Sequence, residues 1–469
     1  MSYFTLVRFN TVDMSGTIVV KGGVLVTNGV SLNTDSFGVV KVAQPYPIFT
    51  SMSVRGSNSL AMDVGTTGGG TVTMNTNVAA ANAGTYTLTA AGAGASAIRQ
   101  SYSYSTYIPG VGKQMMFTGI LQYGQSQGSF TTGQAYTRIG LFDGYNGMYW
   151  SYDASGVVSV NICRSLSKTG TTYTTTIPQS LFNVNTLQVL TVPGQVGTAP
   201  INWAKMQVFY IDQEWLGAGS VRFGVYVNDV LIIAHVVTNF NTLLGPYTPM
   251  PNAPVRYDAI CTEAGKSISV LEGCATVSLN AKISWPPVTN TTLAYCTALA
   301  TYAKAETVIL ALRGSTTAST DSPYYTAGAY DSLTLTSVAC VLTTADTVVI
   351  RVYRVFVRGG TSYGTYTPAT AFANPYPGLP YGNGDTLGPP ACLVEVSTGG
   401  TLALTANTPQ LMATFASTET NRFGGTNTSG AARFGVSLNN VADIYVITAQ
   451  NIGSGDWRGS ILTEWSQET

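Results

Sequence analysis

The sequence has little charge and only one histidine. Charged residues make up 9% of the 469 positions, with 22 basic residues against 22 acidic ones, whereas a typical soluble domain is about 25% charged. Because there is no basic excess, nothing draws the chain electrostatically to nucleic acid or to an anionic membrane, and we expect neither as a partner. A single histidine, His235, excludes an H-E-x-x-H zinc site. We therefore expect no enzyme and no cofactor.

Long apolar runs and targeting signals are also missing. No run approaches the roughly 18 apolar residues of a membrane-spanning helix, and the first residues show no basic segment followed by an apolar core. We therefore expect no secretory route. The six cysteines form no C-x-x-C pair, which argues against a zinc knuckle. Without a secretory route, buried thiols are favoured over disulfides at these positions: Cys163, Cys261, Cys274, Cys296, Cys340 and Cys392.

The residue types that take the place of charged residues are typical of β-structure. The chain has 50 glycines and 27 tyrosines, together with many threonines, serines and asparagines, and it has almost no segment with helical spacing of good helix formers. The stretch 205–237 shows period-two alternation, and turns at Gly217 and at Asn228-Asp229 divide it. This pattern predicts three consecutive antiparallel strands that a second sheet must cover.

The turn signals divide the chain into three regions. Residues 98–286 have the strand spacing of a jelly-roll or lectin-like β-sandwich. Pro286-Pro287 cannot lie within a central strand, so residues 287–469 are predicted to form a second sandwich. Residues 1–97 are rich in small side chains and have too few large apolar groups for a core of their own. The predicted fold is all-β, with tandem antiparallel sandwiches and an N-terminal β region for assembly or attachment.

Few side chains suggest a catalytic role. Asp212 and Glu214 are two residues apart and could share one face of a strand, as the paired carboxylates of a glycosidase do. The favoured alternative is that they form ion pairs with arginines such as Arg222 on the adjacent predicted strand. His235 lies in an apolar strand, and we expect one hydrogen bond to hold it rather than a catalytic role.

Asp143, Asn146 and Asp153 carry oxygens that could ligate calcium. However, Asp, Asn and Gly are also the ordinary residues of hairpin turns, and this interpretation is favoured. Tyrosines cluster more conspicuously, and tyrosine suits contact with sugar rings or with partner subunits. The candidate contact residues are Tyr145, Tyr149, Tyr152, Tyr376 and Tyr381.

Six segments of the chain form a recognisable set: PGVGKQMMFTGIL, TRIGLFDGYNGMYWSYD, VNICRS, WAKMQVFYIDQEWLGAGSVRFGVYVNDVLIIAH, PNAPVRYDA and VADIYVITAQNIGSGDWRGSILTEW. Together they resemble a family of virion structural proteins that occurs in tailed bacteriophages and large DNA viruses. The resemblance covers residues 98–285 and the C-terminal end. It implies a role in the virus particle and assigns no catalytic residue.

These observations favour a structural component of a virion, either a capsid-associated protein or a tail or fibre protein. Such a protein is assembled in the host cytoplasm and acts through contacts with copies of itself and with other virion proteins. The alternative is a carbohydrate-binding receptor-recognition module of a fibre or adhesin, whose partners are host-surface glycans.

Overall fold

The structure is a computed structural model. It describes residues 19–21, 24–27, 30–31, 45–56, 61–105, 107–124, 135–165, 171–191, 198–228, 230–280, 290–314, 334–343, 347–355, 365–376, 394–403, 409–417, 420–422 and 442–468. Within these residues the regular elements are β-strands and two short 3-10 helices, η1 (Ser53–Arg55) and η2 (Gln179–Leu181). No helix in this part of the chain is long and apolar enough to cross a membrane. The predicted all-β fold is confirmed.

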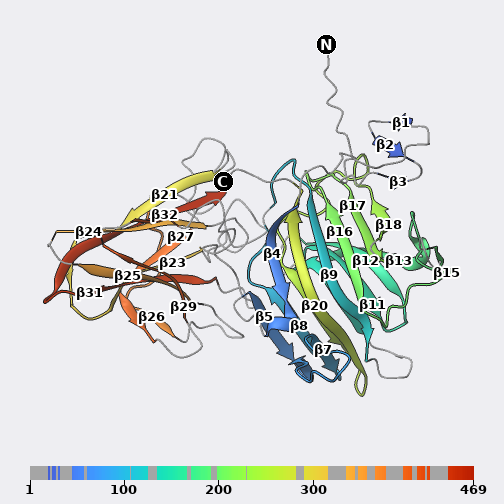
Figure 1. Cartoon of the computed structure of the whole chain (residues 1–469), viewed down its shortest axis with the longest axis horizontal. Helices are drawn as coiled ribbons and strands as arrows, with labels where there is room; N and C mark the ends of the chain where they lie inside the picture. Colours follow the sequence, from blue (N-terminus) through green and yellow to red (C-terminus); the bar gives the residue numbers. More distant parts are fainter. Residues whose placement is uncertain are drawn as a thin grey trace, which may run out of the picture.

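The first sandwich has a seven-stranded and an eight-stranded antiparallel sheet (Figure 1). The seven-stranded sheet runs in the order β13 (Tyr173–Pro178), β12 (Val158–Arg164), β11 (Gly147–Asp153), β10 (Ala135–Phe142), β19 (Val255–Cys261), β8 (Ala95–Ser101), β5 (Met62–Thr67). The eight-stranded sheet runs in the order β18 (Val230–Val237), β17 (Val221–Val227), β16 (Gln207–Gln213), β9 (Lys113–Tyr123), β20 (Ser267–Leu279), β7 (Tyr86–Ala91), β6 (Gly70–Met74), and β4 (Tyr46–Met52) also pairs with β20.

The predicted central meander is confirmed as β16, β17 and β18, which pair consecutively and antiparallel. Alternate residues of these strands enter the core between the two sheets, as period-two patterning requires. Trp150 of β11 lies at the centre of this core with no exposed surface. Its ring contacts those of Phe182, Trp203, Phe209 and Phe223 at centroid distances of 5.6–6.0 Å.

The N-terminal boundary differs from the prediction. Strands β4 to β8 lie in the two sheets of the first sandwich, and β8 spans the predicted boundary at residue 97. The small residues of this stretch explain the difference. Leu88 and Ala90 of β7 and Ala95 and Ala97 of β8 are fully buried in the shared core, because strands with such short side chains can pack only against a core that others supply. Earlier in the chain, β1 (Val19–Lys21), β2 (Val24–Thr27) and β3 (Val30–Ser31) form a small separate sheet.

The second sandwich has two five-stranded sheets. One contains β21 (Asn290–Cys296), β32 (Trp457–Glu468), β24 (Thr334–Leu342), β30 (Thr420–Arg422) and β22 (Ala300–Tyr302). The other contains β27 (Val394–Thr398), β23 (Thr307–Gly314), β31 (Ile444–Asn451), β25 (Val348–Val355) and β29 (Gln410–Ala416). Two pairs of short strands complete the described elements: β14 (Leu190–Thr191) with β15 (Thr198–Ala199), and β26 (Tyr366–Pro368) with β28 (Gly400–Leu402). Pro286-Pro287 lies outside the described residues.

Candidate functional site

The outer face of the seven-stranded sheet carries a network of polar side chains. On β10, Ile139 and Leu141 enter the core, so Arg138 and Phe142 point to the opposite face. The strand register places Asp258 of β19 directly opposite Arg138. It also places Gln100 of β8 opposite Arg256 of β19. Three neighbouring strands therefore bring two arginines, one carboxylate and one amide together.

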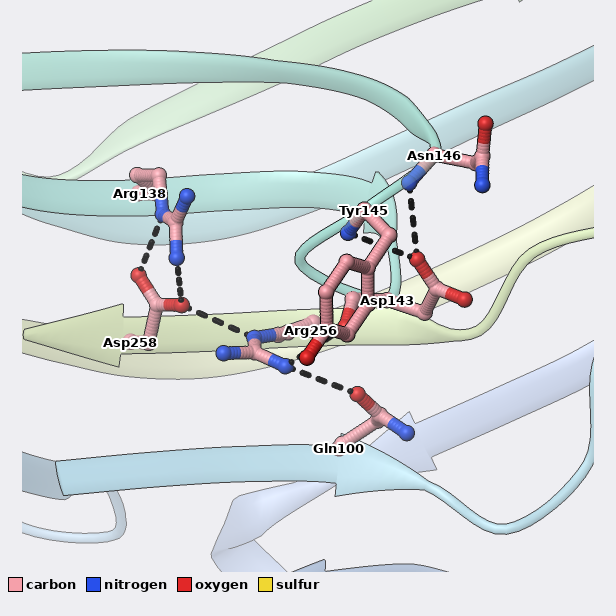
Figure 2. A network of polar contacts seen from close by, with 7 residues as sticks. All are labelled: Gln100, Arg138, Asp143, Tyr145, Asn146, Arg256 and Asp258. Carbon is pink, nitrogen blue, oxygen red and sulfur yellow. Dashed lines mark hydrogen bonds and ion pairs between the residues drawn. The ribbon is translucent and has the colours of Figure 1, made fainter. Parts of the chain in front are cut away.

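One carboxylate binds both arginines (Figure 2). Arg138 donates from Nε to Asp258 Oδ1 at 2.8 Å and from Nη2 to Oδ2 at 2.7 Å. Arg256 donates from Nε to the same Oδ2 at 2.8 Å, and its Nη1 donates to Gln100 Oε1 at 3.2 Å. Asp258 has no exposed surface and the two arginines have less than a tenth, so these are charge-assisted bonds in a site that excludes water.

Burial and charge together set the ionisation of this network. Burial alone would raise the pKa of Asp258, but Arg138 and Arg256 outweigh it and hold the pKa below its usual range. For Arg138, burial alone would lower the pKa, but Asp258 raises it above its ordinary value. Burial raises the pKa of the adjacent Tyr149 to about 12. At neutral pH the site therefore holds two guanidinium groups, one shared carboxylate and a neutral phenol.

A tight turn between β10 and β11 covers one end of the network. Asp143 Oδ1 accepts hydrogen bonds from the backbone N–H groups of Tyr145 and Asn146 at 2.9 and 2.8 Å. The backbone carbonyl of Asp143 accepts a bond from Arg256 Nη1 at 3.0 Å. Asn146 bonds in turn to the backbone of Ser165 through both of its side-chain polar atoms. The turn is therefore tied to the arginine beneath it and to the end of β12.

The turn interpretation of the candidate calcium ligands is confirmed. Asp153 Oδ1 accepts from the backbone N–H groups of Ser155 and Val157, at the other end of β11 from Asp143. Residues 147–152 of β11 separate the two turns, which is roughly 20 Å at about 3.3 Å per residue. Asp143 and Asp153 therefore cannot share an ion. Within the described residues, no group of three or more His, Cys, Asp or Glu side chains could hold a metal.

The four candidate tyrosines that the structure describes do not form one cluster. Tyr149 is buried on the outer face of the sheet against Phe142, and Tyr152 is buried in the core between the sheets. Tyr376 is half-buried in the second sandwich, where its ring lies 6.4 Å from that of Trp465. Tyr145 is half-exposed beside the arginine network, and Tyr381 lies outside the described residues. Neither Tyr149 nor Tyr152 presents a ring to solvent, because strand alternation directs each toward a covered surface.

The candidate acid pair is buried. Asp212 of β16 lies opposite Arg222 of β17 and forms an ion pair with it, as the alternative interpretation predicted. Asp212 has no exposed surface and Glu214 has 2%, so neither carboxylate reaches solvent. His235 also behaves as expected, because its Nδ1 accepts one hydrogen bond from the backbone of Asn183 at 3.1 Å. Burial lowers the pKa of His235. Cys163 and Cys261 are buried free thiols, as expected. The free thiols of Cys274 and Cys340 are half-buried and that of Cys296 is exposed, so burial was wrongly predicted for Cys296. Cys392 lies outside the described part of the chain.

Two adjacent loops at one end of the first sandwich expose large apolar side chains. We call the surface formed by Leu216, Phe240, Leu243 and Leu244 the apolar loop surface. The exposed fractions of these residues are 54%, 67%, 40% and 111%. The sequence pattern did not reveal this surface, because an apolar residue in a turn looks the same whether it folds inward or outward.

The backbone under the apolar loop surface is firmly held. Buried Asn239 donates from Nδ2 to the carbonyl of Gly219 at 2.7 Å, and the backbone N–H of Tyr247 donates to Gly217 at 2.9 Å. The Trp215 indole donates to the carbonyl of Thr248 at 3.0 Å. These bonds join the two loops to each other. The exposed leucines and phenylalanine therefore project from a preorganised base rather than from loose chain.

Comparison with known proteins gives structural similarity without a family. No protein-family model matches the sequence, and no curated protein matches it. Among solved structures, a legume lectin-like domain from Entamoeba histolytica is 12% identical with a TM-score of 0.28, covering 50% of this chain and 98% of that one. The metal-free lectin I-B4 from Griffonia simplicifolia is 11% identical with a TM-score of 0.26, covering 50% of this chain and 100% of that one.

A carbohydrate esterase from the Shiga toxin-encoding bacteriophage phi24B is also similar. It is 11% identical with a TM-score of 0.28, and the match covers 51% of this chain and 100% of that one. Similarity this low carries no information about what the present chain binds.

Proposed function

We propose that this protein is a structural component of a virus particle and that it acts through contacts between subunits. The observation that carries the proposal is the apolar loop surface. Exposing four large apolar side chains on a rigid base is unfavourable in water, and apolar patches of this kind mark interaction sites. The segments that resemble virion structural proteins support the same function, since they include the loop that carries Leu216.

The partner that fits this surface best is a second copy of the chain. Segments 215–221 and 237–250, which form the two loops, contain no charged residue. A strongly charged partner would lose hydration there without gaining an ion pair. Two copies of an uncharged apolar surface meet without repulsion, and the formal net charge of zero removes long-range repulsion between whole chains. Further contacts with other virion proteins would complete the particle.

The experiment is a measurement of mass in solution by sedimentation velocity over a range of concentrations. The wild-type chain should associate, and the double variant Leu216→Asp, Leu244→Asp should sediment as a monomer. The matched control is Val78→Asp, because Val78 is 92% exposed in a turn before β7 and lies outside the apolar loop surface. The control should associate like the wild type. A wild-type chain that stays monomeric at every concentration would overturn the proposal.

A carbohydrate-binding module is the second candidate, and it rests on Tyr145. Tyr145 is half-buried in the turn whose Asp143 carbonyl accepts a hydrogen bond from Arg256, and an aromatic ring close to polar groups suits a sugar. Binding of the wild-type chain on a glycan array, lost in Tyr145→Ala and kept in Tyr173→Ala, would support this function. Tyr173 is the matched control because it is 63% exposed on β13, at the edge of the same sheet. A glycan array that shows no binding of the wild-type chain would exclude the carbohydrate-binding function.

A further inference from the structure

One residue of the apolar loop surface is held in a conformation that its side chain disfavours. Leu216 has a φ of +33°, in the left-handed region where the Cβ of a bulky residue crowds its own backbone. Glycine adopts this region freely, and the same loop has a glycine at the next position, Gly217, with a φ of +75°. The loop therefore carries a large side chain at a backbone position that suits glycine.

The strain at Leu216 differs from that at comparable positions. Within the described part of the chain, four residues other than glycine have a positive φ: Leu187, Leu216, Asn228 and Asn241. Asparagine tolerates the left-handed region, because its short polar side chain can hydrogen-bond locally. Leu187 has no exposed surface, so its burial in the core offsets the backbone cost. Leu216 is 54% exposed, and no comparable burial offsets its cost. Uncompensated backbone strain of this kind is found mainly at functional sites.

A buried tyrosine holds Leu216 in this conformation. The backbone N–H of Leu216 donates to the hydroxyl of Tyr107 at 3.1 Å, and Tyr107 is only 6% exposed. The Tyr107 ring packs edge-on against that of Trp215, with 5.5 Å between the ring centroids. The backbone N–H of Tyr107 donates to Asn252 Oδ1 at 2.7 Å. Tyr107 is therefore fixed by its own contacts, and its hydroxyl in turn fixes the strained residue.

The rest of the loop leaves little room for relaxation. The backbone N–H of Gly219 donates to the carbonyl of Trp215 at 2.8 Å, which closes a single turn around Leu216. A Cβ on Gly219 would lie 1.6 Å from a backbone oxygen of the same turn, so only glycine fits there. A Cβ on Gly217 would lie 3.6 Å from Pro246, which belongs to the second loop. These contacts together determine the direction in which the Leu216 side chain leaves the turn.

We propose that Leu216 is the anchor residue of the contact between two copies of the chain, and that Tyr107 is the positioning residue that holds it ready to insert. This inference rests on the proposed function and names the side chain on which the contact depends. An exposed apolar side chain on a fixed backbone loses little conformational freedom on binding, as an anchor requires. Across a two-fold axis, each copy inserts its Leu216 into the apolar loop surface of the other, so two anchors are buried together.

The proposal predicts opposite rankings for stability and for side-chain size. At an ordinary position, alanine is more favourable than glycine for the stability of the folded chain. At a left-handed position the order is reversed, because only glycine avoids the strain. The melting temperature of Leu216→Gly should therefore exceed that of Leu216→Ala by about 2–4 °C. Both variants lack the anchor, so both should associate at least about tenfold more weakly than the wild type.

Sedimentation velocity measures the association. Thermal unfolding, followed by tryptophan fluorescence at a concentration where the chain is monomeric, measures the melting temperature. Tyr107→Phe keeps the ring against Trp215 but removes the hydroxyl, and it should weaken association by about three- to tenfold although no exposed side chain changes. In the double variant Tyr107→Phe, Leu216→Gly, association should be no weaker than in Leu216→Gly, because no anchor side chain remains to be positioned. The matched control is Tyr366→Phe, since the buried Tyr366 hydroxyl donates to the carbonyl of Gly399 at 3.0 Å in the second sandwich. The control should associate like the wild type.

Two results would overturn the anchor and leave the proposed function intact: association of Leu216→Ala at the strength of the wild type, or a higher melting temperature for Leu216→Ala than for Leu216→Gly. Association of Tyr107→Phe at the strength of the wild type would overturn the positioning role of Tyr107. Failure of the proposed function has a different signature, because the wild-type chain itself would then stay monomeric at every concentration, and both proposals would be refuted.

Discussion

Replacing Asp258 by asparagine removes the one carboxylate that two buried arginines share. Three charge-assisted hydrogen bonds end on this side chain, and each such bond contributes on the order of 1.5–3 kcal/mol. Because Arg138 and Arg256 remain buried without a counter-charge, the loss should approach the cost of breaking a buried pair, about 3–5 kcal/mol. Asparagine keeps the volume, so the change isolates charge from packing.

Urea denaturation followed by tryptophan fluorescence measures this loss, because Trp150 lies in the core of the same sandwich. Asp153→Asn is the matched control, because the Asp153 carboxylate lies near the surface and accepts hydrogen bonds from the backbone N–H groups of Ser155 and Val157. Its replacement should cost about 1 kcal/mol or less. The double variant Asp258→Asn, Arg138→Met should recover part of the loss, since it removes one of the uncompensated charges. A loss below about 1 kcal/mol for Asp258→Asn would show that the network contributes little.

The same network predicts a pH dependence of stability, and Gly140 and Cys163 give two further predictions. The pKa of Asp258 is depressed in the folded state, so its contribution to stability is present above the ordinary carboxyl pKa. This contribution is lost as the pH falls through the lowered value. The loss of stability of the wild type below about pH 4 should therefore be smaller in Asp258→Asn. Gly140→Ala should destabilise the first sandwich by about 1–3 kcal/mol or more, because a Cβ there would lie 2.3 Å from the Met148 carbonyl oxygen. Thermal unfolding measures this loss, and an unchanged melting temperature would contradict the prediction. Cys163 should react with iodoacetamide at least about a hundredfold more slowly than the exposed Cys296, because Cys163 is buried and burial raises its pKa to about 12. Equal labelling rates of the two thiols in a mass-spectrometric time course would refute this prediction.

Local pattern was sufficient for the strands and for most of the turns. Period-two alternation through 205–237 predicts β16, β17 and β18, because a strand side chain can only point to one face or the other and the pattern shows which. Asp143 and Asp153 act as turn residues because their side chains reach backbone N–H groups two to four positions ahead. The pairing of Asp212 with Arg222 could also be predicted from the sequence, since a short connection determines which residues of two adjacent strands lie opposite each other.

Only the tertiary structure decided which distant strands share a sheet. β8 and β19 are neighbours although more than 150 positions separate the residues that pair, such as Gln100 and Arg256, and no local pattern encodes a contact of that range. This is why the carboxylate of Asp258 between its arginines and the N-terminal strands within the first sandwich escaped prediction. Sequence fixes the direction of each side chain relative to its own strand. The assembled layers determine whether that direction leads to water, to a core or to a partner of opposite charge.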